Sequence, residues 1–189
     1  MKYNIHSLKM AYDMNPYMGV DDFLYFWGHQ EPYGIVTKAC LSQWYPCSFY
    51  VDGIYYNCAE QYMMAEKARI FGDESARHKI LAATDPLKMK KLGRQVKNFD
   101  AKIWDNVAPV IVVRGNLAKF GQNPSLLNFL LSTGNKTLVE ASPYDTIWGI
   151  GMTEAQAQNS YPHLWCGTNK LGFSLMDVRD ELRTIKENK

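Results

Sequence analysis

The sequence predicts an α+β fold, a single helix-dominated domain with a small β-sheet or hairpin. Apolar residues recur at helical spacing over 171–185, which indicates an amphipathic helix. An Asp-Gly pair at 52–53 separates two short aromatic runs, the pattern of a β-hairpin. The sequence has no regular βαβ alternation and no GxGxxG loop, so a Rossmann dinucleotide fold is disfavoured.

The composition is that of an ordinary globular chain. Its 189 residues can bury a sizeable core in one domain, and 47% of them are hydrophobic against 21% charged. Aromatic residues, at 13%, can line a pocket for planar ligands as well as fill a core. The formal net charge of +2 is smaller than duplex-DNA binders usually carry. Tight binding of nucleic acid is therefore not implied, whereas a nucleotide or a modified base stays open as a ligand.

The cysteines and histidines form no metal-binding pattern. Cys40, Cys47, Cys58 and Cys166 include no CxxC pair, so neither a zinc site nor another metal or cofactor is expected. Scattered thiols and the lack of a secretory leader are typical of a cytoplasmic protein. The longest apolar run, 109–113, is far too short to cross a bilayer, so we expect no membrane partner.

The sequence of the N-terminal segment predicts little regular structure before the first strand. Residues 1–22 are rich in Met and Tyr and lack clear periodicity, so we expect an N-terminal extension to a domain spanning 23–189. The run FLYFW at 23–27 predicts a short buried strand. The Asp-Gly pair suits the positive φ angles of a type I′ turn between strands at 48–51 and 54–56.

Three consecutive helices are predicted after the hairpin. The first covers 58–71, with Asn57 as N-cap, Glu60 completing a capping box and Gly72 at the C-terminal end. Two further helices run from Asp73 to about Ala83 and from Pro86 to about Gly93.

The segment 100–119 fits two structures. The residues VIVV favour a strand, whereas the spacing of Val110, Val113 and Leu117 favours a helix. We predict a helix, with Pro109 near its N-terminus or at a break. Later elements are a helix over 124–131, a strand over 137–141 and a final helix with the apolar stripe Leu171, Leu175, Val178, Leu182 and Ile185.

One candidate site lies on the helix predicted at 58–71. One helical face carries Glu60, Met63, Met64 and Lys67. Glu60 and Lys67 are about 10 Å apart along the axis, too far for a direct ion pair. An acid and an amine beside adaptable Met side chains could line a pocket. Alternatively, Glu60 only completes the capping box and the stem of Lys67 covers the core.

A second candidate site is the glycine-containing segment at 138–151. It follows a predicted strand, where loops often carry functional residues. Asp145 is a candidate general acid or base, or an acceptor for a ribose hydroxyl, and Trp148 could stack a base. Gly149 would let the backbone approach a ligand closely. Alternatively, Asp145 forms a turn and Trp148 fills the core.

Cationic residues cluster between 88 and 102. The cluster consists of Lys88, Lys90, Lys91, Arg94, Lys97 and Lys102. It is either a phosphate-binding surface or a solvated helix face. Arg94, which follows a glycine, and Lys119, in a separate motif, are the candidates to meet a substrate phosphate.

Two shorter motifs supply further candidates for substrate binding. Ser42, Gln43 and Trp44 lie just before the hairpin, and the first two are hydrogen-bonding residues. Asn169 precedes the final helix, where it binds substrate or only caps the helix.

In this order, the segments resemble the NADAR family. The matching motifs are LSQWYPCSFYVDGIYYNCAEQYMMAEKARIFGD at 41–73, LGR at 92–94, Trp104, NLAKFGQN at 116–123, LVEASPYDTIWGIG at 138–151 and GTNKLGFSLMDVRDEL at 167–182. The resemblance covers about residues 23–185. It implies an enzyme that hydrolyses the N-glycosidic bond between a ribose carbon and a base nitrogen.

The resemblance also assigns roles to residues. The essential Glu of the family corresponds to Glu60, its Lys to Lys67 and its Asp-x-x-Trp to Asp145 and Trp148. The Ser-Asn-Phe common in the family is Ser42-Gln43-Trp44 here, so a contact made by the Asn is not carried over. We expect Glu60, Lys67, Asp145 and Trp148 to converge on one pocket.

Two chemical routes fit these residues. A carboxylate can stabilise the charge that develops on the sugar carbon, while an acid protonates the leaving nitrogen. Alternatively, the Lys67 amine captures the opened sugar aldehyde as a Schiff base. A Lys67 pKa lowered by burial would favour the second route.

Three functions are compatible with the resemblance. The leading one is removal of ADP-ribose from guanine bases, with a small-molecule or base-linked ADP-ribose substrate and modified nucleic acid as a further candidate. The second is hydrolysis of phosphoribosylamino-pyrimidine intermediates of riboflavin biosynthesis. The third is a module that binds NAD or ADP-ribose without cleaving it.

Overall fold

Two strands from distant parts of the chain form a parallel pair. The computed structural model, which describes residues 2–15, 17–30 and 34–188, pairs β1 (Phe23–Phe26) with β4 (Thr137–Glu140). Phe23 lies opposite Thr137, and Phe26 opposite Glu140. Both strands were predicted, but their pairing was not. Because parallel strands end at the same edge, the segments that follow β1 and β4 leave the pair together.

The chain divides into two compact units. The terminal unit comprises residues 1–42 and 128–189, and the central unit comprises residues 43–127. Helices predominate in both units, which confirms the helix-dominated α+β class. The boundary predicted at residue 22 stays a prediction.

The core of the terminal unit is formed by β4 and the C-terminal helix α8 (Lys170–Glu187). Leu138 and Val139 of β4 are fully buried, as are Leu175 and Val178 of α8. The predicted stripe on α8 is therefore correct except at Ile185, which is 45% exposed because it lies in the last turn of the helix. Further elements of this unit are α7 (Glu154–Gln158), the 3₁₀ helices at Val20–Asp22, Lys38–Leu41 and Pro162–Leu164, and most of α6 (Pro124–Ser132).

The N-terminal segment contains a helix that the sequence pattern did not predict. Helix α1 (Ile5–Met14) begins with a capping box, in which Asn4 Oδ1 accepts from the Ser7 N–H at 2.9 Å and Ser7 Oγ accepts from the Asn4 N–H at 3.2 Å. Leu8 is its one buried residue, so the apolar periodicity is weak. Local capping therefore marks this helix better than periodicity does.

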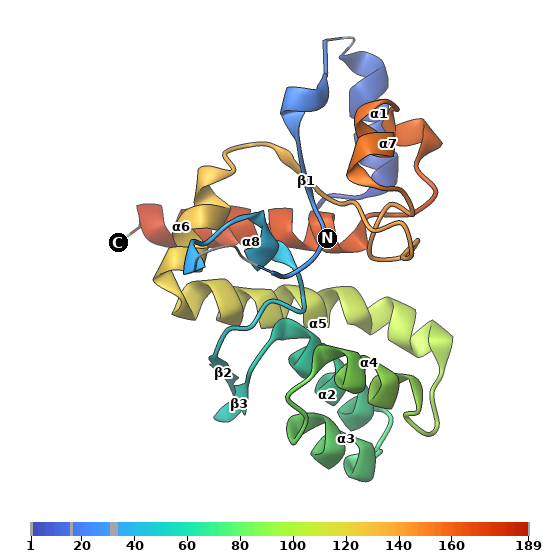
Figure 1. Ribbon diagram of the computed structural model, residues 1–189, viewed down its shortest axis with the longest axis vertical. Coiled ribbons are helices and arrows are strands. Elements are labelled where there is room, and N and C mark those ends of the chain that lie inside the picture. Colours follow the sequence, from blue (N-terminus) through green and yellow to red (C-terminus); the bar gives the residue numbers. More distant parts are fainter. Residues whose placement is uncertain (1, 16, 31–33, 189) are drawn as a thin grey trace. The chain divides into compact units, whose positions relative to one another are not determined.

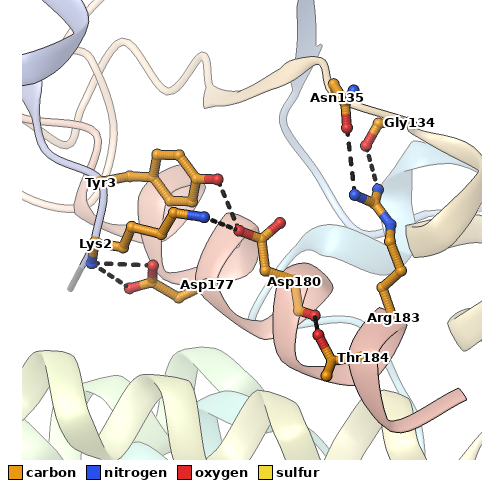
Figure 2. Close-up of polar contacts among 8 residues, drawn as sticks. All are labelled: Lys2, Tyr3, Gly134, Asn135, Asp177, Asp180, Arg183 and Thr184. Atoms are coloured by element: carbon orange, nitrogen blue, oxygen red, sulfur yellow. Dashed lines mark hydrogen bonds and ion pairs between the residues drawn. The ribbon is translucent and has the colours of Figure 1, made fainter. Parts of the chain in front are cut away.

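Lys2 and Tyr3, which precede α1, attach to α8, as Figure 2 shows. The Lys2 backbone N–H donates to both Asp177 carboxylate oxygens, at 3.1 and 3.2 Å. Lys2 Nζ and the Tyr3 hydroxyl each lie 2.7 Å from Asp180 Oδ2. Burial alone would raise the pKa of Asp180, but these two hydrogen bonds outweigh burial and lower it. The start of the chain is thus part of the terminal unit.

The central unit consists of a hairpin and four helices. The hairpin pairs β2 (Phe49–Val51) with β3 (Ile54–Tyr56), and its turn residues Asp52 and Gly53 have φ angles of 51° and 77°. These angles confirm the predicted turn. The helices are α2 (Ala59–Ile70), α3 (Glu74–Leu81), α4 (Pro86–Arg94) and α5 (Ala101–Gln122). Helix α2 packs against each of the other three, and Figure 1 shows the three shorter helices on the same side of α5.

The start of α2 differs from the predicted capping box. Cys58, not Asn57, is the N-cap, and its side chain makes no capping hydrogen bond. The side chain that reaches back belongs to Gln61, whose Oε1 accepts from the Asn57 N–H at 2.9 Å. Gln61 Nε2 also donates to three carbonyls at the end of α3, and these bonds fix its orientation. Glu60 is therefore not a capping residue.

Helix α5 is continuous, so neither predicted position of Pro109 is correct. Pro109 lies well inside the 22-residue helix, as its ninth residue. Proline cannot donate to the Asp105 carbonyl. Asp105 is exposed, so water can satisfy that carbonyl and the helix continues. Neither α5 nor any other helix in the described ranges is both long and apolar enough to cross a membrane.

Candidate active site

Lys67 lies half-buried on α2 beside two aromatic rings. Its Nζ is 4.0 Å from the ring centroid of Phe99 and 5.6 Å from that of Trp104. Burial lowers the pKa of the Lys67 amine, the Arg94 guanidinium lowers it further, and the Glu60 carboxylate opposes both. Lys67 therefore carries a larger fraction of neutral amine than an exposed lysine, and a nucleophilic amine must be neutral.

Glu60 is held in the first turn of the same helix. The residue is 6% exposed, and its backbone N–H donates to the Gln43 carbonyl at 2.9 Å. The dipole of α2 favours a negative charge at this end. Because Gln61 makes the bond expected of a capping residue, helix capping does not explain the Glu60 carboxylate.

Arg94 reaches this region because α4 packs closely on α2. A Cβ at Gly93 would clash with the side chain of Met64. The glycine before Arg94 thus serves contact between helices, whereas the sequence had suggested approach to a ligand. Arg94 is exposed, and its charge acts on Lys67. The structure therefore brings a carboxylate, an amine and an accessible guanidinium to one part of the central unit.

The other predicted phosphate ligand, Lys119, is fully buried in α5. Its Nζ lies 5.6 Å from the ring centroid of Tyr45 and 5.1 Å from that of Phe120. Burial raises the pKa of the Cys47 and Cys58 thiols, and the positive charge of Lys119 partly counteracts this rise. Of the two predicted cations, Arg94 is the one at the surface.

The segment before the hairpin is tied to two helices. Gln43 Oε1 accepts from Asn116 Nδ2 at 3.0 Å, and the Gln43 carbonyl accepts from the Glu60 N–H. Trp44 is half-buried, with Lys90 Nζ 5.7 Å from its ring centroid. Ser42, also half-buried, is the last residue of this part of the terminal unit. Gln43 thus holds the first turn of α2 in place.

In the terminal unit, Asp145 organises the loop after β4. Its Oδ1 accepts from the backbone N–H groups of Ile147 and Trp148, at 2.9 and 2.8 Å. Its own carbonyl accepts from the Gly151 N–H at 3.0 Å. The predicted turn-forming role is therefore present. Asp145 is only partly buried, so the same carboxylate is also accessible to a ligand.

The start of α8 fixes this loop from the other side. Four N–H groups, of Thr168, Asn169, Lys170 and Leu171, donate to the carbonyls of Thr146, Gly149, Ile147 and Trp148, at 3.0 to 3.2 Å. Backbone N–H groups at a helix start have no partner within the helix. The loop satisfies them, and in return its backbone at Trp148 is held in place.

Gly149 is required by the loop itself. A Cβ at this position would lie 2.9 Å from the carbonyl oxygens of both Asp145 and Glu140. The glycine thus lets the loop close over the end of β4. The sequence had suggested that it would admit a ligand.

Asn169 joins α8 to β4 and does not cap its helix through its side chain. It is fully buried, with a left-handed φ of 53°. Its Oδ1 accepts from the Glu140 N–H and its Nδ2 donates to the Leu138 carbonyl, both at 2.9 Å. Asn169 thus occupies the predicted N-cap position, but capping by its side chain is wrong, because the amide continues the hydrogen bonding of the strand edge.

Four aromatic residues near these sites were given no role from the sequence, although Trp104 was among the motifs that resemble the family. Phe99 and Trp104 lie beside Lys67 in the central unit. In the terminal unit, Trp27 and Tyr144 are 56% and 86% exposed, with ring centroids 6.1 Å apart. Trp27 directly follows β1, and Tyr144 lies in the loop after β4. An exposed pair at the carboxyl edge of parallel strands could have been found only with the strand pairing in hand.

The predicted site residues fall in both units. Glu60, Lys67 and Arg94 belong to the central unit, and Asp145 and Trp148 to the terminal unit. The convergence of all of them on one pocket stays a prediction. Across the described ranges, no group of three or more His, Cys, Asp or Glu side chains could hold a metal ion.

Comparison with known proteins establishes the family. The model of the NADAR domain matches residues 25–183. The N-glycosidase R617 of Acanthamoeba polyphaga mimivirus is 47% identical over 169 residues, covering 87% of this chain and 98% of the relative. The chain belongs to the NADAR family. A riboflavin biosynthesis protein of Vibrio vulnificus is 30% identical over 177 residues, which are 94% of this chain and 43% of that protein.

A solved structure agrees with this NADAR assignment. The NMR structure of the Escherichia coli protein YbiA matches with a TM-score of 0.72 and 26% identity, over 91% of this chain and 90% of that one. Curated YbiA of E. coli strain K12 is itself named an N-glycosidase. These names confirm the expectation of an enzyme that hydrolyses N-glycosyl compounds.

The first prediction concerns the Glu60 carboxylate. Glu60→Gln keeps the shape of the side chain but removes its charge and basicity. We expect kcat on a cleavable N-glycoside to fall by about 10²–10⁴-fold, the usual value of a general acid or base. The melting temperature should stay nearly unchanged, since Gln61 carries the local hydrogen bonding at the helix start. Glu74→Gln, which removes an exposed carboxylate from the same unit, is the control. Wild-type kcat in Glu60→Gln would leave the carboxylate with no catalytic role.

The second prediction concerns Asn169. Asn169→Ala leaves the Glu140 N–H and the Leu138 carbonyl without the Asn169 amide, and it puts an alanine at a left-handed φ. We expect the free energy of unfolding, measured by denaturant titration, to fall by roughly 2–5 kcal/mol. Asn169→Gly tolerates the backbone angle, so it should recover about 1 kcal/mol of that loss. Equal stability of wild type and both variants would contradict a structural role for the amide.

Proposed function

We propose that this NADAR chain removes ADP-ribose from guanine bases by hydrolysing the bond between the ribose C1 and a base nitrogen. The observation that carries the proposal is the grouping of Glu60, Lys67 and Arg94 in the central unit. It combines a buried carboxylate, an amine with a lowered pKa and an exposed cation suited to a phosphate.

The lowered pKa of Lys67 favours the Schiff-base route. In that route, the ribose ring opens at C1 and the neutral amine of Lys67 attacks this carbon. The C1–nitrogen bond breaks, and the base nitrogen leaves with a proton. Water then hydrolyses the imine between Lys67 and the sugar, releasing the sugar aldehyde. The net reaction consumes one water and yields the free base and free ADP-ribose, with Glu60 as the group that transfers protons.

The relative from Vibrio vulnificus favours a second function. Its name places that protein in riboflavin biosynthesis, and the match covers 43% of its length. Hydrolysis of a phosphoribosylamino-pyrimidine needs the same three central residues and a single phosphate, for which Arg94 suffices. A module that only binds ADP-ribose is the weakest alternative, because relatives are named as N-glycosidases.

The third prediction separates the two substrates. The chain is incubated with ADP-ribosylated guanosine and with the phosphoribosylamino-pyrimidine, and the released sugar is measured by mass spectrometry. We expect faster release from the guanosine compound. Release from the pyrimidine compound alone would overturn the proposal.

The fourth prediction tests the Schiff base. Incubation with substrate and cyanoborohydride should reduce the imine and leave a sugar adduct on the peptide that contains Lys67. Lys67→Arg keeps the positive charge but cannot form the imine, so both the adduct and turnover should be lost. Lys79→Arg, an exposed position in α3, is the control and should behave as wild type. Turnover of the wild type without any adduct would favour the carboxylate route.

A further inference from the structure

The central unit contains a polar pocket with a volume of about 330 Å³. Its walls come from the β2–β3 hairpin and from α2, α3 and α5. The polar residues that line it are Asp52, Tyr62, Glu66, Arg69, Arg77 and Arg114. Pockets for small molecules begin at about this size. Three guanidiniums from three helices therefore meet in a space large enough for a small metabolite.

This pocket is separate from the Lys67 region. Tyr62, Glu66 and Arg69 are spaced by four and three residues and so share one face of α2. Glu60 and Lys67 lie on nearly the opposite face, because they are offset from Tyr62 by two and five residues. A ligand in the pocket would thus be distinct from the N-glycoside substrate.

The three arginines are partnered to different degrees. Arg114 donates hydrogen bonds to both carboxylate oxygens of Asp52, at 2.7 and 2.8 Å. Arg69 donates to the Glu66 carboxylate from its Nε and Nη2. Arg77 makes a single bond from Nη1 to Glu74, at 3.2 Å. Its Nε is buried and has no hydrogen-bond partner among the described residues. Arg77 therefore carries the donors and the positive charge that the pocket itself does not neutralise.

A buried hydroxyl lines the same space. The Tyr62 ring packs against Gly115 of α5, where a Cβ would clash with it, and the residue is 1% exposed. Among the described residues, the Tyr62 hydroxyl has no hydrogen-bond partner with good geometry, although the Arg114 side chain lies close by. Burial, and then the charge of Glu66, raises the pKa of Tyr62 to about 12, so the hydroxyl stays a donor. Buried polar atoms without partners are uncommon and costly, and they call for an acceptor.

We propose that this pocket binds the phosphate group of a small phosphorylated sugar. Phosphate offers several charged acceptor oxygens, which suit the forked donors of Arg77 together with the Tyr62 hydroxyl. A carboxylate ligand has only two such oxygens. Asp52 and Glu66, already paired with arginines, can accept hydrogen bonds from sugar hydroxyls with their remaining lone pairs. The pocket thus matches a ligand with one anionic end and one hydroxyl-bearing end.

Calorimetric titration of the full chain tests the proposal without any turnover. The ligands are ribose 5-phosphate, inorganic phosphate and ribose, at constant ionic strength. We expect ribose 5-phosphate to bind saturably and ribose not to bind. Arg77→Gln should weaken binding about tenfold or more, since hydrogen bonds to charged groups are worth about 1.5–3 kcal/mol. Tyr62→Phe, which keeps the ring beside Gly115, should weaken it several-fold. Equal affinity for inorganic phosphate would identify free phosphate as the ligand of the same site.

Control variants assign the binding to this pocket. Lys79→Gln removes one positive charge from α3 at an exposed position and should leave the Kd unchanged. Arg77→Lys keeps the charge but loses the fork, so it should bind more weakly than wild type even if Arg77→Gln fails to fold. If neither phosphate compound binds, the proposal is wrong. It is also wrong if Arg94→Gln abolishes binding while the Arg77 and Tyr62 variants do not, because the ligand would then occupy the Lys67 region.

Discussion

Helix α2 is buried on nearly every side, and the rest of the central unit is arranged around this constraint. Two neighbouring helices approach it at glycines, Gly93 of α4 beside Met64 and Gly115 of α5 beside Tyr62. A larger residue at either glycine would push a helix away from α2. The polar side chains of α2 that are buried, such as Glu60, Gln61 and Glu66, each need a partner or a site. The two polar faces of α2 are therefore the places where function is expected.

In the terminal unit, the main constraint is that the loop after β4 is held rigid. The start of α8 needs acceptors for its N–H groups, and the carbonyls of residues 146–149 supply them. Asp145 then fixes the same loop through two more backbone hydrogen bonds. A loop fixed by backbone bonds on both sides keeps its side chains in one geometry, as catalysis requires. The turn-forming and functional roles of Asp145 are thus compatible, although from the sequence they looked like alternatives.

Local signals in the sequence predicted most elements but not their partners. The Asp-Gly turn, the Asp73 cap and Pro86 at a helix start depend on neighbours within a few residues, and all three were correct. The parallel pairing of β1 with β4 joins residues more than 100 positions apart, so no local pattern reports it. The capping box failed for a related reason: Gln61 bonds both Asn57 and the end of α3, which Glu60 does not. Phe99 was missed because only the packing of α2 brings it to Lys67.

The surroundings of Lys67 have to satisfy two opposed demands. The amine must be neutral to attack a carbon, yet it must also be held in one position. Burial and the Arg94 charge meet the first demand, because both lower the Lys67 pKa. The face of Phe99 meets the second, since it attracts the protonated amine by roughly 0.5–1 kcal/mol. That attraction is smaller than the 1.36 kcal/mol that corresponds to one pKa unit. The ring can therefore position the amine without locking it in the charged state.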